Sequence, residues 1–487
     1  MAHLSHGLTT PPRRALPGHG ATIVYRVSLY PVATLIDELH SALPDMRLLI
    51  DVADTESFRF DETAFLHAGL PLAVAFPTST ADVVQIVRLA SAAGVPIVAR
   101  GAGTGLSGGA VAVDGALTVA FTKMNAILEI DTANLTATLQ PGVINAELNR
   151  AANEQGLFYP PDPASYEQCT IGGNVAENSG GLRCVKYGVT RDWVAGLEVV
   201  LADGSVIRTG GKNKKDVAGY DLTGLFVGSE GTLGLVTEVT VRLLPTPPAK
   251  LTLIAFFATV HDAGEAVAGI TAAGVVPVTL ELMDAFTIAA VDDVHHLGLD
   301  RTAGALLMVE SDLGGAAAEA QLAAVEAACT AARAISVLRA ADAQEADWLR
   351  QARREAHGSL EKMGAARMDD VTVPRSKVPD MIDAIARIAT EKRMRLGVFG
   401  HAGDGNLHPT YIVDRDDPTA ETQIDAVRDE IYRAALALGG AITGEHGTGL
   451  AKKRWLELQR GARSVELMRA IKHTLDPAGL LNPGKVF

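Results

Sequence analysis

Cysteine is scarce in this sequence. Only Cys169, Cys184 and Cys329 occur among 487 residues, and no two of them form a Cys-x-x-Cys pair. The chain therefore cannot by itself ligate a four-cysteine zinc ion or iron–sulfur cluster. A sparse and odd set of cysteines also argues against a disulfide framework, so we expect a protein of a reducing compartment.

Long hydrophobic runs are lacking as well. The longest, such as 251–260, are far shorter than the ~20 apolar residues that cross a bilayer. Residues 1–20 include Pro11-Pro12-Arg13-Arg14 but no apolar signal-peptide core, so they predict a disordered arm. These features predict a soluble, cytoplasmic protein that is at most peripheral to the inner face of the membrane.

Positive charge is in deficit. The chain has 43 Lys and Arg against 57 Asp and Glu, a net charge of -14, which disfavours non-specific binding to nucleic acid. Hydrophobic residues make up 48% and charged residues 21%, which allows a full core in every domain. The length suggests two or three domains.

Local patterns divide the chain at two places, which separates residues 1–70, 71–247 and 248–487. In the second part, Ser79 to Asp82 resembles a capping box that begins a helix, Gly94 ends it, and a buried strand follows at 95–99. Asp203-Gly204 predicts a hairpin.

Prolines at 245, 247 and 248 mark the main domain boundary. Beyond it, strands at 251–258 and 279–283 and helices at 261–273 and 315–333 predict an α+β fold, with helices packed on an antiparallel sheet.

A glycine-rich loop follows the strand at 95–99. It comprises Arg100, Gly101, Ala102, Gly103, Thr104, Gly105, Leu106, Ser107, Gly108 and Gly109. Closely spaced glycines let backbone N–H groups converge on an anion. Gly103, Gly105 and Gly108 match the dinucleotide fingerprint, but a strand and turn at 110–115, rather than a helix, are expected to follow, which excludes a Rossmann loop. A flexible surface linker is the alternative.

Two further glycine-rich segments lie at 160–181 and 228–234. Three separated loops of small and hydroxyl residues predict one extended ligand that crosses several loop ends. FAD is long enough to require such an arrangement.

Metal-type ligands are concentrated in two other segments, 400–408 and 443–449. His401 and His408 flank a glycine-rich turn, and Glu445 adds a carboxylate from the second segment. Two histidines and one carboxylate suit zinc or another first-row divalent ion with open positions. The alternative is a set of buried, hydrogen-bonded polar residues in glycine turns. Neither segment is a helical His-Glu-x-x-His motif.

These motifs, together with Leu480-Leu481-Asn482-Pro483-Gly484-Lys485, resemble those of the FAD-linked oxidases of the vanillyl-alcohol oxidase superfamily. The closest branch contains the glycolate oxidase flavin subunit, FAD-dependent D-lactate dehydrogenases and D-2-hydroxyglutarate dehydrogenase. The resemblance covers about residues 70–487. It implies an FAD-binding domain of two α+β subdomains at 71–247, an α+β substrate or cap domain with an antiparallel sheet at 248–440, and a C-terminal segment, 441–487, that returns to the flavin.

The resemblance also implies which residues bind FAD. The glycine loop from Arg100 would hold the pyrophosphate, Glu230, Gly231 and Leu233 would lie near the adenine, and Asn482 would lie near the flavin ring. The path between these ends would be lined by Pro161, Asp162, Ser165, Thr170, Gly172, Gly173 and Ala176. Some superfamily members attach FAD through a histidine in this loop. No His or Cys lies between Arg100 and Gly109, so we expect non-covalent FAD.

In the metal-containing members, the positions of His401, His408 and Glu445 ligate a divalent metal, for which we expect zinc, and that of His446 is the catalytic base. A guanidinium matches a carboxylate in two hydrogen bonds, so we expect Arg353, or else Arg354, to bind the substrate carboxylate. The alternative for both arginines is a solvated helix face with Arg–Glu pairs.

The sequence departs from the 2-hydroxyglutarate enzymes at two positions. Met368 replaces a lysine, and Thr410 replaces an asparagine. Both changes weaken the case for a second substrate carboxylate and favour the glycolate and D-lactate branch.

We therefore expect an FAD-dependent dehydrogenase that converts a small 2-hydroxy acid to the 2-oxo acid. Its external electron acceptor would be a quinone, a cytochrome, an electron-transfer flavoprotein or an iron–sulfur subunit; direct use of oxygen and a homodimeric state stay open. The alternatives are a D-2-hydroxyglutarate dehydrogenase, a metal-dependent hydrolase, and a flavin subunit that is inactive outside a complex.

Overall fold

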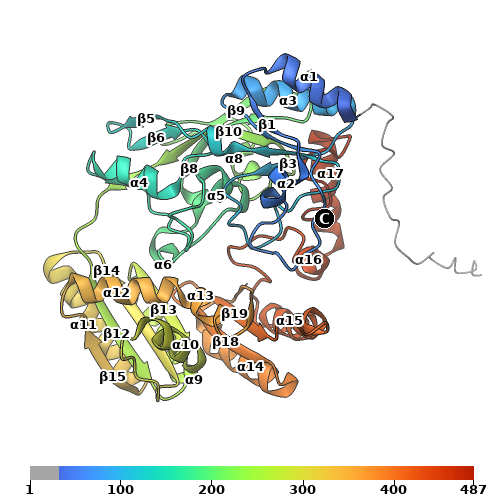
Figure 1. The fold of residues 1–487 in the computed structure, drawn as a ribbon. Coiled ribbons are helices and arrows are strands. Elements are labelled where there is room, and N and C mark those ends of the chain that lie inside the picture. Colours follow the sequence, from blue (N-terminus) through green and yellow to red (C-terminus); the bar gives the residue numbers. More distant parts are fainter. Residues whose placement is uncertain (1–31) are drawn as a thin grey trace, which may run out of the picture.

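The computed structural model describes residues 32–487 (Figure 1). The arm expected at residues 1–20 lies outside the described residues. Within them, the first helix is α1 (Val32–Ala42), and no helix combines the length and apolar character needed to cross a membrane.

A small mixed sheet carries the glycine loop. Its strand order is β1-β2-β4-β3, and β4 pairs in parallel with both β2 and β3. The strands are β1 (Arg47–Leu49), β2 (Ala73–Phe76), β3 (Ile97–Arg100) and β4 (Leu117–Ala120). Helix α3 (Thr80–Ala93) connects β2 to β3. As predicted, it begins at a capping box formed by Ser79 and Asp82 and ends at Gly94, whose φ is 65°.

No helix begins at the glycine loop, which confirms that this is not a Rossmann arrangement. The prediction of a strand within 110–115 is wrong, because residues 101–116 contain neither helix nor strand. The backbone there bonds to other loops instead. Ala112 donates to Arg59 O and accepts from Gly69 N, while Val111 O accepts from the Lys485 ammonium.

A five-stranded antiparallel sheet with order β5-β6-β10-β8-β9 follows. Its strands are β5 (Ile127–Asp131), β6 (Thr136–Leu139), β8 (Val194–Val200), β9 (Val206–Gly210) and β10 (Leu235–Arg242), and β8 and β9 form the hairpin predicted at Asp203-Gly204. The helices of this region are α4 (Asn145–Asn153), α5 (Ile171–Glu177), α6 (Cys184–Tyr187), α7 (Thr190–Trp193) and α8 (Leu222–Phe226). A short pair, β7 (Leu157–Phe158) and β11 (Leu244–Pro245), leads out of it.

The next part, residues 251–437, is called the cap region here. It is built on an antiparallel sheet with order β15-β12-β14-β13-β18-β19-β16, and β17 also pairs with β19. The strands are β12 (Leu251–Phe257), β13 (Thr279–Asp284), β14 (Ala305–Ser311), β15 (Ala334–Arg339), β16 (Ala365–Met368), β17 (Val371–Thr372), β18 (Arg395–His401) and β19 (Asn406–Val413).

Helices cover both faces of the cap sheet. Along β12, Leu253 and Phe257 belong to one core cluster and Ile254 and Phe256 to another, as the alternation of a strand requires. The first face is covered by α9 (Val260–Ala272), α11 (Gly315–Ala331), α14 (Val378–Lys392) and α15 (Ala420–Ala437). The second is covered by α10 (Ala285–His295), α12 (Ala343–Arg354) and α13 (Ala356–Glu361). The α+β class with an antiparallel sheet is confirmed.

The chain then returns to the glycine loop. After the cap region come α16 (Lys453–Arg460) and α17 (Ala462–Leu475), drawn in red in Figure 1. Helix α16 packs on α15, where Trp455 Nε1 donates to Asp429 Oδ1 over 2.9 Å, whereas α17 packs on the core of the five-stranded sheet. Beyond α17, Leu481 bridges in parallel to Ile97 of β3, and Asn482 N donates to Ile97 O over 2.7 Å. The last turn of the chain therefore lies at the strand that leads into the glycine loop.

Candidate functional site

The glycine loop forms one wall of a cavity of about 140 Å³. The other walls come from the two further glycine-rich segments, as the sequence predicted for one extended ligand. The lining residues include Arg100, Gly101, Ala102, Gly103, Thr104, Gly105, Ser165, Thr170, Gly172, Gly173, Ala176, Glu230 and Gly231.

Close packing explains why glycine is needed in these walls. A side chain at Gly101 would place its Cβ 2.4 Å from the Thr170 hydroxyl, and one at Gly172 would meet the Pro141 ring at 2.5 Å. Thr170 cannot readily move aside, because its hydroxyl caps α5 by accepting from Gly173 N over 3.1 Å. The cavity is therefore shaped by backbone surfaces.

Other expected cofactor residues do not line this cavity. Leu233 is buried in the core of the five-stranded sheet, and Pro161 accepts a hydrogen bond from Asn145. Asp162 is buried in an ion-pair cluster with Arg183 and Arg354.

Asn482 and the end of the glycine loop are joined by hydrogen bonds. Asn482 Nδ2 donates to Gly109 O over 2.9 Å and to Glu230 O over 2.7 Å. Ser107 O accepts from the backbone N–H groups of Leu450 and Ala451, and Gly108 has a φ of 80° and packs against Leu450. The C-terminal segment thus fixes the loop backbone.

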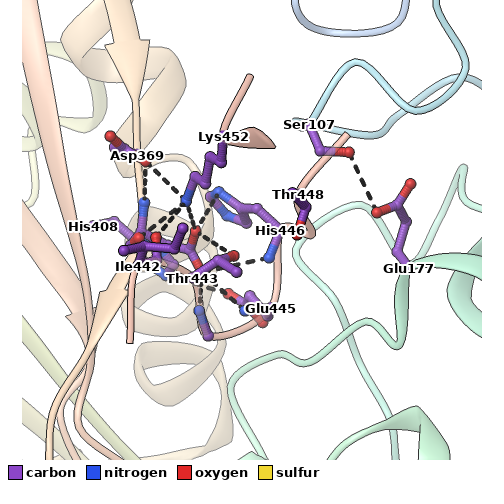
Figure 2. Close-up of polar contacts among 12 residues, drawn as sticks. Ser107, Glu177, Asp369, His408, Ile442, Thr443, Glu445, His446, Thr448 and Lys452 are labelled. Atoms are coloured by element: carbon purple, nitrogen blue, oxygen red, sulfur yellow. Dashed lines mark hydrogen bonds and ion pairs between the residues drawn. The ribbon is translucent and has the colours of Figure 1, made fainter. Parts of the chain in front are cut away.

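Glu177 and Glu230 are buried acids on this boundary. Glu230 accepts from Thr448 N over 2.8 Å and Gly449 N over 2.7 Å, and burial raises its pKa to about 7. Burial also raises the pKa of Glu177, whose carboxylate accepts from Ser107 Oγ over 3.3 Å (Figure 2). Glu177 was not among the residues predicted for the site, although an acid within a glycine-rich segment is a usable signal.

A second cavity of about 640 Å³ adjoins the first. Both are lined by Thr104, Gly105, Ser165, Glu177 and Ser179. The expected loop residue Leu106 lines the second cavity only. On its cap side, the second cavity is lined by Arg353, Arg354, Met368, Phe399, His401, His408, Glu445 and His446. The residues expected for metal, base and carboxylate binding therefore face one space that is continuous with the glycine-loop cavity.

His401 and His408 are brought together by the β18–β19 hairpin. Its turn needs glycine at 405, where φ is 86° and a Cβ would lie 2.0 Å from Val373 O. His401 Nε2 lies 3.1 Å and His408 Nε2 3.3 Å from the same oxygen, Glu445 Oε1.

One ligand atom from each of these three residues lies within 4.8 Å of the others. A zinc ion bonds nitrogen and carboxylate oxygen at about 2.0–2.2 Å, so this donor set fits a first-row divalent metal. The fit rests on the convergence of two imidazole nitrogens and a carboxylate oxygen.

The electrostatics of this cluster favour a positive charge. Burial by itself lowers the pKa of His401, but Glu281 and Glu445 outweigh it and raise that pKa well above its usual value. Burial likewise raises the pKa of Glu445, yet His401 and His408 bring it well below its usual value. Two buried carboxylates beside one imidazole therefore attract a cation.

The turn that carries Glu445 and His446 is held by Asp370. One carboxylate oxygen of Asp370 accepts from Gly444 N over 2.6 Å and Glu445 N over 2.8 Å, and the other accepts from Thr443 Oγ1 over 2.9 Å. Lys452 pairs with Asp370 and donates to Ile442 O, so it closes the turn from the other side (Figure 2).

His446 is the residue expected to act as base. Its Nδ1 lies 3.4 Å from Asp370 Oδ1, and its ring stacks on that of His408 with centroids 5.2 Å apart. Burial lowers the pKa of His446 to about 4, although Asp370 acts in the opposite direction. The ring is therefore neutral at pH 7, with Nδ1 facing a carboxylate.

The two candidate arginines have different surroundings. Arg353 is 3% exposed, lies over the Phe399 ring at 4.8 Å, and its Nη2 is 2.6 Å from Glu281 Oε2. Arg354 pairs with Asp162 over 2.8 Å and lies over the Tyr166 ring, so it joins the cap region to the N-terminal region. The alternative prediction, that both arginines lie on a solvated helix face, is wrong for Arg353, because this side chain is buried.

The structure joins a cavity walled by glycine-rich segments to a histidine–carboxylate cluster, an arrangement that suits a flavoprotein. The FAD binding domain family matches residues 71–210, and the family of FAD linked oxidases, C-terminal domain, matches residues 246–486. The chain belongs to the FAD-linked oxidases and is an FAD-dependent oxidoreductase.

Curated relatives cover nearly the whole chain. Glycolate oxidase subunit GlcD of Bacillus subtilis is 47% identical over 86% of this chain and 90% of its own. The D-2-hydroxyglutarate dehydrogenase of Xanthomonas citri is 37% identical (92% and 96%), and the D-lactate dehydrogenase of Anaerostipes hadrus is 35% identical (90% and 94%).

A solved structure of p-cresol methylhydroxylase superposes with a TM-score of 0.79 at 18% identity, covering 95% of this chain and 98% of that one. At that identity the likeness supports the fold alone.

The close contact at Gly101 gives a first prediction. Gly101→Ala should weaken FAD binding at least about tenfold, because the added methyl group meets the Thr170 hydroxyl and displaces the loop. The flavin-to-protein absorbance ratio and titration of the apoprotein with FAD measure this. Gly269→Ala is the matched control, since its Cβ would lie 3.8 Å from Ala328. Full FAD affinity in Gly101→Ala would show that this part of the loop does not shape the cofactor site.

Proposed function

We propose that the protein oxidises a small 2-hydroxy acid, of the glycolate or D-lactate type, to the corresponding 2-oxo acid. The observation that carries this proposal is the second cavity, where a metal-type cluster, a neutral histidine and a buried arginine face the space that adjoins the glycine loop. Relatives named for glycolate, D-lactate and D-2-hydroxyglutarate support the same substrate class.

Each part of the chain has a role in this proposal. Residues 71–247 bind FAD non-covalently, residues 248–440 form the substrate or cap domain, and residues 441–487 complete the active site. His401, His408 and Glu445 hold a divalent metal, proposed to be zinc. When bound, the flavin accepts a hydride equivalent and the metal polarises the substrate hydroxyl.

The protein's own groups position the substrate and move its proton. His446 Nδ1 faces Asp370, which leaves Nε2 to take the proton from the substrate hydroxyl. Arg353 binds the substrate carboxylate, because its guanidinium is buried and lines the same cavity. The hydroxyl proton thus goes to His446, while FAD, when bound, would take up the two electrons and the second hydrogen from the substrate carbon.

The surroundings of Met368 favour a small substrate. Met368 lines the second cavity and is the cross-strand partner of Thr410. The two departures from the 2-hydroxyglutarate enzymes therefore lie opposite each other on neighbouring strands, and neither supplies a cation for a second carboxylate. D-2-hydroxyglutarate remains the second candidate, supported by the 37% identical relative. Family membership removes the metal-dependent hydrolase alternative.

Electrons leave the flavin to an external acceptor in this proposal. The sequence holds only three cysteines and no Cys-x-x-Cys pair, so an iron–sulfur cluster would have to belong to another chain. A quinone, a cytochrome, an electron-transfer flavoprotein or an iron–sulfur subunit would fill that role. We place the enzyme in the cytoplasm or at the inner membrane face, with a homodimer as the oligomeric state to test.

Anaerobic bleaching of the flavin tests the substrate class. FAD-loaded protein mixed with short D- and L-2-hydroxy acids should lose its absorbance near 450 nm with glycolate or D-lactate, and more slowly with D-2-hydroxyglutarate, because Met368 offers no charge to its second carboxylate. Stopped-flow absorbance measures each rate. Reduction by none of these acids would refute the proposal and favour a subunit that is inactive alone.

Removal of the proposed base tests the proton step. His446→Ala should keep FAD but slow flavin reduction by about 10²–10⁴-fold, since the group proposed to take the hydroxyl proton is lost. His473→Ala, an exposed histidine on α17, is the control and should reduce at the wild-type rate. A normal reduction rate in His446→Ala would place the base elsewhere.

Chelation tests the metal. Dialysis against EDTA should slow turnover and leave the flavin bound, because the histidine–carboxylate cluster and the glycine-loop cavity have separate linings. Metal content, flavin content and turnover are measured on the same sample, and added Zn²⁺ should restore the rate. Loss of metal with full activity would exclude the proposed metal role.

A further inference from the structure

A buried carboxylate lies behind the proposed metal cluster. Glu281 is on β13 and is 1% exposed. Its two oxygens lie 2.9 and 3.0 Å from His401 Nδ1, and Oε2 is also 2.6 Å from Arg353 Nη2. No residue near Glu281 in the chain indicates a site, so the sequence alone does not predict a role for it.

Strand register brings Glu281 to His401. β13 and β18 are antiparallel, with Leu282 paired to Gly400 and Met283 to Phe399. One residue further along the same register, Glu281 comes opposite His401. The contact is therefore built into the cap sheet and does not depend on a mobile loop.

This contact determines which nitrogen of His401 is available. A carboxylate beside Nδ1 requires a proton on Nδ1, so the lone pair of the neutral ring is on Nε2. Nε2 is the atom that lies 3.1 Å from Glu445 Oε1, inside the cluster with His408. Ligating histidines in proteins are commonly oriented by a carboxylate in this way.

The same carboxylate fixes Arg353. A buried guanidinium needs a nearby negative charge. In the part of the chain that the structure describes, Arg353 forms its ion pair with Glu281. The guanidinium carbon of Arg353 also lies over the Phe399 ring, 4.8 Å from the ring centroid. One side chain therefore joins the group proposed to bind the substrate carboxylate to a group proposed to bind the metal.

We propose that Glu281 is a positioning residue that directs His401 Nε2 at the metal and holds the Arg353 guanidinium in place. This inference rests on the proposed metal site, and it goes beyond it by assigning the residue that orients the site. Glu281 itself contacts neither substrate nor metal in this proposal.

Metal affinity is the measurement that separates positioning from folding. FAD-loaded protein is freed of metal by EDTA, the EDTA is removed, and Zn²⁺ is titrated in competition with a chromogenic chelator. Glu281→Gln should bind Zn²⁺ about 10–100-fold more weakly than the wild type. The visible absorption of the Co²⁺-loaded protein should also change, because the position of the His401 ring is no longer fixed.

Glu310→Gln is the matched control. Glu310 lies on the neighbouring strand β14, is 1% exposed, and pairs with Lys250 and Arg350, so it is an equally buried carboxylate of the same sheet. Its loss should lower the melting temperature as much as the loss of Glu281. Its Zn²⁺ affinity and Co²⁺ spectrum should match those of the wild type.

Turnover at saturating metal adds a second readout. Excess Zn²⁺ should recover part of the activity of Glu281→Gln, because the ligand is misdirected but present. The same excess should recover none in His446→Ala. Should Glu281→Gln fail to fold, Glu281→Asp retains the charge and shortens the reach by one methylene, and it should still bind Zn²⁺ more weakly.

The outcomes separate this inference from the proposed function. A wild-type protein that binds Zn²⁺ tightly, together with unchanged affinity in Glu281→Gln or Glu281→Asp, overturns the inference alone. Equal weakening in Glu310→Gln also overturns it, because the effect is then on folding. A wild-type protein that binds no divalent metal overturns both the metal part of the proposed function and this inference.

Discussion

The site depends on one buried carboxylate, that of Asp370. Its two oxygens accept from backbone N–H groups of the 443–446 turn and from the Thr443 hydroxyl, and Lys452 neutralises it. Beside it, Asp369 pairs with Arg428 and Lys452. A carboxylate buried this deeply is stable only when such partners are complete. The turn is therefore fixed, and with it the relative positions of a proposed metal ligand and the proposed base.

Three distant stretches of sequence meet at this turn. The cap sheet supplies the two histidines, the N-terminal sheets supply the glycine loop, and the C-terminal segment supplies the turn. Glu230 secures the junction by accepting from Thr448 and Gly449, and Asn482 secures it by donating to Gly109 O and Glu230 O. Hydrogen bonds to backbone groups thus join the glycine loop to the segment that follows the 443–446 turn.

Local signals in the sequence predicted much of this arrangement. The helix start at Ser79, the helix end at Gly94 and the hairpin at Asp203-Gly204 depend on neighbouring residues only. The glycine loop and the β18–β19 hairpin with its two histidines are likewise visible as local motifs. The roles of Glu281 and Asp370 could not be predicted in the same way. Glu281 depends on the register between β13 and β18, and Asp370 contacts a turn that begins 73 residues later in the chain. The strand expected at 110–115 fails for a similar reason: its β-rich residues bond to distant loops and to Lys485. The ion pair of Asp162 with Arg354 also joins two regions far apart in the chain, so no local signal predicted it.

The bond from Asn482 to the glycine loop also bears on biosynthesis. The loop leaves the ribosome early, whereas the residue that fixes its backbone is made only after the whole cap region. Contacts between such distant segments form late, after the intervening chain has been synthesised and has begun to fold. The backbone of the glycine loop therefore reaches its final conformation late in chain synthesis, after the cap region has been made.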